Sequence, residues 1–454
     1  MGQVAGPPSR YLEDASGFFG HAERVIIPVD ETGVIAALRE SSLSGVPVTI
    51  AGAGTGVTGA RVPQGGWVLS LEKLTRLEIQ PGYAIAGAGV ILRDLHAAAH
   101  ASGQFYPPDP TETSASIGGT IATNASGSRS FKYGATRRWI ERLRVVLADG
   151  RLMEIGRGDA IDFDPGTIPL PNVTKNTAGY LLRPGMDWVD LFTGSEGTLG
   201  VVTEARLKLL PAPPALLAGV IFFGSDEAAL EAVDDWRTGT SSRMLEYLDE
   251  PSLALLSIRF PEIPRAARAA ILFEQELGDG HEVESWLARI EAAHGLDESW
   301  LADSAVDRER FRRFRHALPE LVNDTVRRNG MLKMGTDHAV PIEHNREMLA
   351  YYRGRLEEEF AGRYVIFGHI GDAHLHVNIL PSPEEAERAA ALLAEFARQA
   401  VASGGTVSAE HGLGKRKAHL LALQYAPEQI EAMKAVKRRL DPQNILGRGT
   451  LLTA

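Results

Sequence analysis

The sequence of 454 residues contains no cysteine. Disulfide bonds, thiolate metal sites and iron–sulfur clusters are therefore excluded on this chain. An electron relay through an iron–sulfur centre is excluded for the same reason. The absence of cysteine does not by itself indicate a cellular compartment.

An excess of positive charge and long apolar runs are also missing. Lysine and arginine number 47 against 58 acidic residues, a formal net charge of -11. A surface that binds nucleic acid normally shows a basic excess, so we expect no nucleic-acid partner. No apolar run reaches the roughly 18–20 residues that span a bilayer, and Met1–Gly20 is polar, so neither a transmembrane segment nor a signal peptide is expected. We expect a cytoplasmic protein. Loose attachment to a membrane complex and assembly as a homodimer are both compatible with the sequence.

The length exceeds that of one ordinary core, so two or three lobes are expected. The first half alternates short apolar runs with helical patterns. Strands are predicted at 24–29, 46–50, 66–71 and 83–86, and helices at 32–40 and 90–101. Proline-rich Leu209–Pro214 is the predicted linker. Beyond it we predict strands at 217–223, 270–273, 364–369 and 375–380, and helices at 226–237, 308–328, 342–360, 383–402 and 427–440. The pattern indicates an α+β protein.

Three glycine-rich loops lie in the first half. Ala51–Gly59 follows a predicted strand, and its bare backbone N–H groups could surround a pyrophosphate. It lacks the Gly-Lys-Ser/Thr ending of a P-loop, and no helix opens after it, as a Rossmann fingerprint requires. Tyr106–Gly127 mixes small hydroxyl and amide side chains with glycine, and Thr193–Glu204 is a glycine turn that enters a strand. Together the loops favour a backbone that lines a flat polar ligand.

Histidine is concentrated near the C-terminus. Of 13 histidines, His369, His374, His376 and His411 lie within about forty residues. Side chains alternate along a strand, so His374, His376 and Asn378 would share one face. In Ser408–Gly414 a carboxylate adjoins an imidazole. Two or three imidazoles with a carboxylate suit Zn²⁺ or Mn²⁺ at an open site, which leaves positions for substrate or water.

The loops and the histidine motif together resemble the vanillyl-alcohol oxidase / p-cresol methylhydroxylase superfamily. The resemblance is greatest to its D-lactate, D-2-hydroxyglutarate and glycolate dehydrogenase group, and it runs from about Val25 to Leu446. It implies a two-subdomain FAD-binding domain over 1–211, and a substrate (cap) domain over 212–415 with an antiparallel sheet and the metal site. It also implies a C-terminal segment over 416–454 whose helix returns to the FAD domain. FAD would be bound non-covalently, and a bond to cysteine is excluded.

The resemblance also implies which residues bind FAD. The first loop would hold the pyrophosphate, and the other two would line the ribityl chain and the isoalloxazine. The implied residues are Gly52, Gly54, Thr55, Gly56, Gly59, Pro108, Asp109, Ser116, Gly118, Gly119, Thr123, Ser126, Tyr133, Gly197 and Val202. The family often has arginine before the first glycine, where this chain has Ala51. More of the phosphate contact would then come from backbone donors.

By the same resemblance, the metal ligands are His369, His376 and Glu410, and the general base is His411. Residues expected at the substrate are Arg315, Asn378, His374 and Lys333. The family commonly has Gly-Asn where this chain has Ala373-His374, so His374 could be a further ligand, an outer donor to a ligand, or neither. Lys333 lies in Leu332–Asp337, which is predicted to be a strand that ends at Pro341. Hydroxyglutarate enzymes place a lysine where this chain has Gly335, one strand repeat after Lys333. This difference favours a monocarboxylate such as D-lactate.

The implied activity is metal-assisted oxidation of a small D-2-hydroxy acid to the 2-oxo acid. His411 would remove the hydroxyl proton while a hydride passes to flavin N5. A quinone, a cytochrome or an electron-transfer flavoprotein would then reoxidise the flavin. Alternatives are D-2-hydroxyglutarate or glycolate as substrate, a metal-free aryl-alcohol or sugar-lactone oxidase, and an alkyl-transferring member of the superfamily. A zinc hydrolase with structural loops and a non-catalytic subunit of a glycolate-oxidising complex also remain open.

Overall fold

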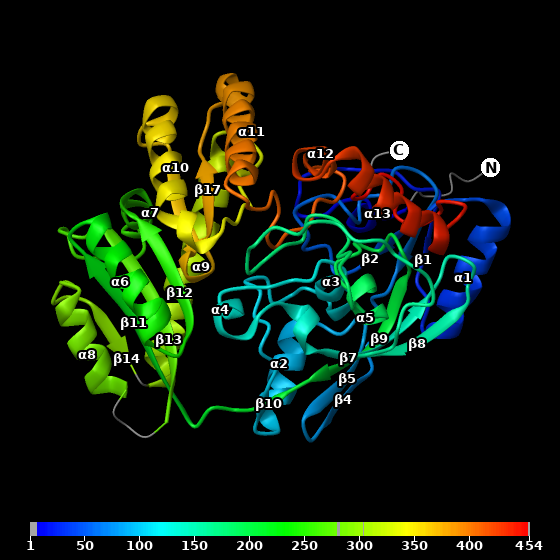
Figure 1. Ribbon diagram of the computed structural model, residues 1–454, viewed down its shortest axis with the longest axis horizontal. Helices are drawn as coiled ribbons and strands as arrows, with labels where there is room; N and C mark the ends of the chain where they lie inside the picture. Colours follow the sequence, from blue (N-terminus) through cyan, green and yellow to red (C-terminus); the bar gives the residue numbers. More distant parts are fainter. Residues whose placement is uncertain (1–6, 279–281, 303, 453–454) are drawn as a thin grey trace.

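The computed structural model describes residues 7–278, 282–302 and 304–452. Two lobes lie side by side (Figure 1). The N-terminal part of the chain, drawn in blue through cyan to green, and the C-terminal segment, drawn in red, form one lobe. The green to orange part of the chain forms the other. Within the described residues, no helix has the length and apolar character that crossing a membrane requires.

The first subdomain of the N-terminal lobe is a small parallel sheet covered by one helix. Strands β1 (Arg24–Ile26), β3 (Trp67–Ser70) and β2 (Val48–Ala51) pair in that order. Helix α1 (Glu31–Ser44) begins where the Asp30 side chain accepts the N–H of Gly33, and it ends at Gly45, whose φ is 69°. Val34 and Leu38 of α1 pack on Trp67 and Leu69. The first glycine loop leaves this sheet after β2.

The second subdomain is a five-stranded antiparallel sheet in the order β4-β5-β9-β7-β8. Its strands are β4 (Leu77–Gln80), β5 (Tyr83–Gly87), β9 (Val201–Lys208), β7 (Ile140–Val146) and β8 (Leu152–Gly156). Its helices are α2 (Leu92–Ala101), α3 (Ile117–Ala122), α4 (Ser130–Tyr133) and α5 (Trp188–Phe192). The second and third glycine loops contain α3 and the approach to β9, so both loops lie on this subdomain. Short 3-10 helices of the chain are Ser9–Tyr11, Thr136–Trp139, Ile342–His344, Ile370–Asp372, Pro383–Glu385 and Ala418–Leu420.

The second lobe is built on a seven-stranded antiparallel sheet with helices on both faces. The strand order is β14 (Trp300–Ala302), β11 (Ala215–Phe223), β13 (Ala269–Leu277), β12 (Ser242–Asp249), β16 (Tyr364–His369), β17 (His374–Ile379) and β15 (Met334–Gly335). Helices α6 (Asp226–Gly239), α8 (Glu282–Ala292), α10 (Asn345–Phe360) and α11 (Ala386–Ala402) share one core. Helices α7 (Glu250–Leu256) and α9 (Ala305–Arg328) belong to another core. Because strand residues alternate, Phe223 joins the first core and Phe222 the second.

The C-terminal segment returns to the N-terminal lobe, as the resemblance implies. Helices α12 (Leu421–Gln424) and α13 (Pro427–Leu440) lie against it in Figure 1. Met433 and Leu440 belong to the same core cluster as α5. Leu446 forms a parallel bridge with Val48 of β2. The predicted α+β fold, with an FAD-type lobe, an antiparallel cap sheet and a returning helix, is confirmed.

Two local predictions need correction. The predicted linker Leu209–Pro214 contains a short strand, β10 (Leu210–Pro211), which pairs with β6 (Gln104–Phe105). Proline is tolerated there because this two-stranded ribbon has no further partner strand. The strand expected over Leu332–Asp337 is reduced to β15, at the sheet edge, because only Met334 and Gly335 pair with β17.

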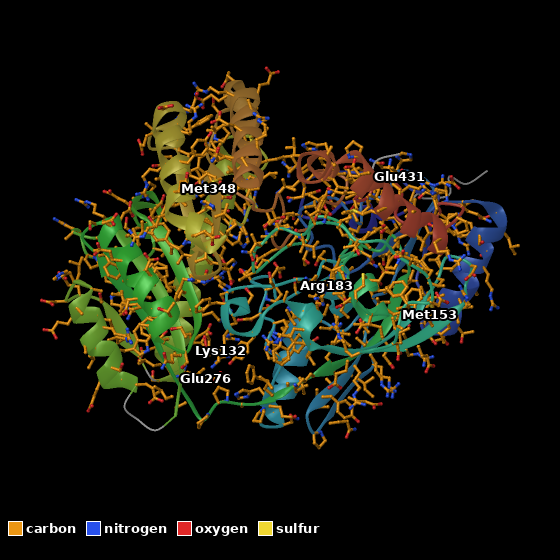
Figure 2. All side chains as sticks on the ribbon, viewed as in Figure 1. Lys132, Met153, Arg183, Glu276, Met348 and Glu431 are labelled. Atoms are coloured by element: carbon orange, nitrogen blue, oxygen red, sulfur yellow. The ribbon has the colours of Figure 1, made fainter. Side chains whose placement is uncertain are left out.

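Charged side chains join the two lobes. Arg129, which follows the second glycine loop, lies 3.0 Å from Asp109 of its own lobe and 3.3 Å from Glu274 on β13. Lys132 of α4 lies 3.0 Å from Glu276, and Figure 2 shows the pair where the lobes meet. These pairs hold the second glycine loop against the cap sheet.

Candidate active site

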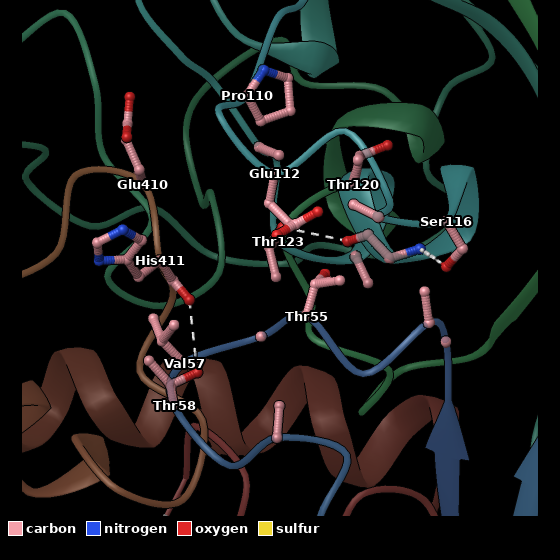
Figure 3. A pocket seen from close by; sticks show the side chains of 18 of the residues that line it. Thr55, Val57, Thr58, Pro110, Glu112, Ser116, Thr120, Thr123, Glu410 and His411 are labelled. Atoms are coloured by element: carbon pink, nitrogen blue, oxygen red, sulfur yellow. Dashed lines mark hydrogen bonds between the residues drawn. The ribbon is translucent and has the colours of Figure 1, made fainter. Parts of the chain in front are cut away.

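A cavity of about 410 Å³ lies between the lobes, a volume typical of small-molecule sites. All three glycine loops line it on one side, and the histidine motif lines it on the other. Figure 3 shows Glu410 and His411 facing the loop with Thr55 and the segment from Ser116 to Thr123. The lining residues that the sequence predicted for FAD are Gly52, Gly54, Thr55, Gly56, Ser116, Gly118, Gly119, Thr123, Ser126, Gly197 and Val202.

The glycines of the loops are required by close packing. A Cβ on Gly118 would lie 2.8 Å from the Ala88 Cβ and 3.1 Å from its carbonyl oxygen. Gly54 and Gly197 have φ of 88° and 71°, which L side chains rarely adopt. Helix α3 begins where Ser116 Oγ accepts the N–H of Gly119. Bare backbone at the wall of a cavity is what an extended dinucleotide needs, so these residues fit FAD.

The histidines meet because β16 and β17 form a tight hairpin. His369 at the end of β16 is paired with His374 at the start of β17, and the turn between them passes through Ala373 at a φ of 50°. His374 and His376 share a face, and their ring centroids are 4.4 Å apart. One ligand atom from each of His369, His374, His376 and Glu410 lies within 4.8 Å of the others. The donor set is imidazole and carboxylate, which fits a divalent transition metal.

Each imidazole has an acceptor on its outer side. Glu246 on β12 lies 2.5 Å from His369 Nδ1, and Asp337 lies 3.2 Å from His374 Nε2. The Thr336 carbonyl oxygen is 3.4 Å from His376 Nδ1. At His369 and His376 the acceptor fixes the tautomer and leaves the other nitrogen free to bind a metal, as is usual around metal-binding histidines.

Glu410 is held by groups from the N-terminal lobe. Its Oε1 accepts from Ser126 Oγ at 2.8 Å and from Lys175 Nζ at 2.6 Å, and it lies 3.3 Å from His369 Nε2. Burial opposes ionisation, but His369 and Lys175 keep the pKa of Glu410 well below its usual range. Lys175 is also 3.2 Å from Asp372, so the two carboxylates share one ammonium group.

His411 lines the cavity next to Glu410. Its Nδ1 lies 3.3 Å from Asp337 Oδ1, and its ring is 5.6 Å from that of His376. Removal from bulk water lowers the pKa of His411 although Asp337 acts in the opposite direction. A neutral imidazole whose Nδ1–H points to a carboxylate has a free Nε2 and can accept a proton.

Cationic side chains complete the wall. Arg315 on α9 lines the cavity, with Nε 2.8 Å from Glu246 and Nη1 2.9 Å from Thr111 Oγ1. Lys333 also lines the cavity. Removal from water and then the charge of Lys417 lower the pKa of Lys333. Arg315 and Lys333 therefore bring positive charge to the cavity wall, which suits an anionic ligand.

Other predicted residues lie outside the cavity wall. Asn378 and His374 are buried behind it. Asp109 pairs with Arg129, and the Tyr133 hydroxyl donates to Glu276 at the lobe boundary. The Pro108 carbonyl lies 3.0 Å from His96, and a Cβ on Gly59 would lie 3.0 Å from Phe18. Asp109, Tyr133 and Pro108 therefore contact protein groups.

Three residues at the centre of the site were not predicted to act there, namely Lys175, Glu246 and Asp337. Glu246 could have been suspected, because it is an acid inside the apolar run Leu245–Leu248. Its neighbour Tyr247 points to the other face of the sheet and donates to Asp226. Lys175 has no comparable local signal.

Comparisons with known proteins agree with this architecture. Residues 212–451 match the family described as FAD linked oxidases, C-terminal domain, and residues 22–156 match the FAD binding domain. "Glycolate oxidase subunit GlcD" of Bacillus subtilis (strain 168) is 33% identical over 448 residues, which are 94% of this chain and 88% of that protein. "D-lactate dehydrogenase" of Archaeoglobus fulgidus is 32% identical over 435 residues, 94% of this chain and 91% of that protein. "D-2-hydroxyglutarate dehydrogenase" of Xanthomonas citri pv. viticola is 30% identical over 441 residues, 94% of this chain and 88% of that protein.

A solved structure of alkyldihydroxyacetonephosphate synthase superimposes with a TM-score of 0.70 at 16% identity. It covers 93% of this chain and 75% of that one, and at this identity it shows the fold alone. The chain belongs to the FAD-linked oxidases, and it is an FAD-dependent oxidoreductase. The predicted resemblance to the D-2-hydroxy acid dehydrogenase group is confirmed by relatives that bear those names.

Proposed function

We propose that this protein oxidises a small D-2-hydroxy acid, with D-lactate as the first candidate, to the 2-oxo acid. The observation that carries the proposal is one cavity lined by the FAD loops, by an imidazole–carboxylate cluster and by Arg315. When bound there, FAD supplies a two-electron acceptor for the hydride that leaves the substrate carbon. Relatives named for D-lactate, D-2-hydroxyglutarate and glycolate support this substrate class.

Arg315 is proposed to bind the substrate carboxylate. Guanidinium matches a carboxylate in two-point geometry. Glu246 holds the Arg315 Nε and Thr111 holds Nη1, so the guanidinium is fixed before a substrate arrives. Glu246 also contacts His369, so a single carboxylate sets the position of both the carboxylate-binding cation and a cluster histidine. This arrangement would place the α-carbon between Arg315 and the cluster.

His411 is proposed to remove the hydroxyl proton. Its Nδ1 is occupied by Asp337, so Nε2 is the nitrogen available to the substrate. A divalent cation held by His369, His376 and Glu410 would supply Lewis acidity at the hydroxyl. Lys333 lines the cavity and is a further proposed substrate-facing residue. Asn378 is also predicted to contact the substrate, but it is buried behind the cavity wall.

The first alternative is a metal-free alcohol or lactone oxidase of the same fold. Nothing in such a reaction would require three outward-supported imidazoles around a carboxylate. The electron acceptor proposed for the reduced enzyme is a quinone, a cytochrome or an electron-transfer flavoprotein. A cytoplasmic location, with or without loose attachment to a membrane, is compatible with each acceptor.

The test is anaerobic reduction of the purified flavoprotein by D- and L-2-hydroxy acids, followed by flavin absorbance. We expect rapid bleaching by a D-2-hydroxy monocarboxylate, loss of bleaching after EDTA treatment, and recovery with Zn²⁺ or Mn²⁺. Bleaching by an alcohol or lactone that persists in EDTA would favour the metal-free alternative. A His411→Gln variant that retains FAD and metal but reduces at the wild-type rate would refute the base assignment.

A further inference from the structure

We infer that His374 is a fourth metal ligand, bound through Nδ1, in addition to His369, His376 and Glu410. The inference rests on the proposed function only in assuming that this cluster holds a divalent cation. The family that the sequence resembles commonly has asparagine where this chain has His374. The structure distinguishes among the roles that the sequence leaves open for it.

The burial of His374 argues against a purely structural role. Its side chain is fully buried, with an exposed fraction of 0%. Neither ring nitrogen makes a hydrogen bond of normal geometry with any described residue. A buried polar atom without a partner costs about 1–3 kcal/mol. Nε2 has Asp337 beside it, but the described residues supply no partner for Nδ1.

The orientation of His374 matches that of the two neighbouring histidines. Like His369, it directs one nitrogen outward to a carboxylate, with His374 Nε2 lying 3.2 Å from Asp337 Oδ1. The inner nitrogen, Nδ1, faces Glu410 Oε1 at 3.9 Å. This distance is too long for a hydrogen bond, which excludes His374 as a donor to that carboxylate. Two atoms that share a cation through bonds of about 2.0–2.2 Å are separated by about 3–4 Å, which 3.9 Å matches.

The charges are consistent with a cation at this point. Lys175 forms ion pairs with both Glu410 and Asp372. One ammonium group cannot neutralise two carboxylates, so one negative charge remains. A divalent ion would balance that charge and satisfy the inner nitrogens of three imidazoles. Four protein ligands still leave a position for substrate, because zinc can become five-coordinate and Mn²⁺ prefers six ligands.

The experiment compares His374→Asn, which restores the family residue, with wild type and with a matched control, His338→Asn. His338 is also buried in this lobe but contacts Tyr352 at 3.4 Å. Competition with a fluorescent chelator measures the Zn²⁺ and Mn²⁺ affinity of each FAD-loaded protein. We expect His374→Asn to weaken binding of at least one of the ions by about tenfold or more, and His338→Asn to leave both affinities unchanged. Equal affinities for His374→Asn and wild type would overturn the inference.

A second measurement needs no variant. X-ray absorption of the zinc-loaded wild type should show scattering from three imidazoles, whereas two imidazoles would overturn the assignment even if His374→Asn failed to fold. The result is independent of turnover. A wild type that binds zinc through three imidazoles but is not bleached by any 2-hydroxy acid would refute the proposed function and leave the fourth ligand standing. A wild type that binds neither ion would overturn the ligand assignment.

Discussion

Asp337 Oδ1 lies 3.3 Å from Nδ1 of His411, and Asp337 Oδ2 accepts the backbone N–H of the same histidine at 2.9 Å. One buried carboxylate therefore fixes both the ring and the main chain of the proposed base. Ser408 Oγ donates to Oδ2 at 2.8 Å, so the carboxylate is itself held in place. With its Nδ1–H directed at Asp337, His411 presents Nε2 to the cavity in the form that accepts a proton.

Replacing Asp337 with asparagine should slow flavin reduction much more than it weakens substrate binding. The amide can turn its NH₂ toward His411 and favour the wrong tautomer, a loss of about 100-fold or more in similar arrangements. Single-turnover reduction over a range of substrate concentrations separates the limiting rate from the dissociation constant.

The matched control is Asp249→Asn. Asp249 is equally buried and accepts N–H groups from Ser252 and Ile366, but its hydrogen bonds are not to histidine. We expect its limiting rate to stay within a fewfold of wild type, provided that FAD is retained. An Asp337→Asn enzyme with normal single-turnover rates would show that His411 does not depend on this contact.

Substitution of Arg315 should separate binding from chemistry. Lysine keeps the charge but cannot contact Glu246, Thr111 and a substrate carboxylate in one plane. We expect Arg315→Lys to raise KM for the D-2-hydroxy acid by about tenfold or more, with a smaller effect on kcat. Arg312→Lys is the control, because Arg312 is exposed and pairs with Glu309, one turn away on the same helix. Equal KM values for both variants would remove Arg315 from the substrate site.

Local patterns were sufficient to predict several elements of the fold. The bounds of Tyr364–His369 and Pro427–Leu440 agree with the structure. Each has a local cause: the first is a run of apolar and small residues before a glycine turn, and the second begins with proline at its first turn. The expected strand at Leu332–Asp337 failed because pairing at a sheet edge depends on the partner strand. Of the described residues there, only Met334 and Gly335 form ladder pairs with β17.

The candidate site also contains contacts that the sequence predicts and contacts that it does not. The meeting of His369 with His374 and His376 follows from a hairpin within one motif, so the sequence predicts it. Lys175 reaches Glu410 across 235 residues, and Glu246 reaches His369 across 123. Such contacts arise from the packing of one lobe on the other and of β12 on β16. No periodicity or spacing in a single sequence encodes them.

The buried Glu196 should make stability depend on pH. It lies in the third glycine loop at a φ of 52°, and it accepts the N–H groups of Leu413 and Gly414 at 2.9 and 2.8 Å. Burial raises the pKa of Glu196 from 4.5 to about 7. A folded-state pKa above the unfolded value gives stability that is present at low pH and is lost as pH rises through about 7.

The non-titrating variant Glu196→Gln removes this dependence. Relative to it, wild type should lose about 3 kcal/mol of unfolding free energy between pH 4.5 and pH 8, by linkage of about 1.4 kcal/mol per pKa unit. Thermal midpoints of both proteins at a fixed FAD concentration provide the measurement. Parallel pH profiles for the two proteins would mean that Glu196 ionises normally in the folded state.

Lys175 and Lys132 make a matched pair for testing what holds the lobes together. Each ammonium group pairs with a carboxylate of the second lobe, but the Lys175 side chain is 1% exposed and that of Lys132 is 28% exposed. Removing one partner of a buried ion pair typically costs about 3–5 kcal/mol, because the remaining charge is left without compensation. A partly exposed pair contributes about 1 kcal/mol or less.

In EDTA, Lys175→Met should therefore melt well below wild type and Lys132→Met close to it. Added Zn²⁺ should restore more stability to Lys175→Met than to wild type, since the ion then neutralises Glu410 in place of the ammonium. Equal melting points for the two variants in EDTA would show that the Lys175–Glu410 contact does not stabilise the metal-free protein.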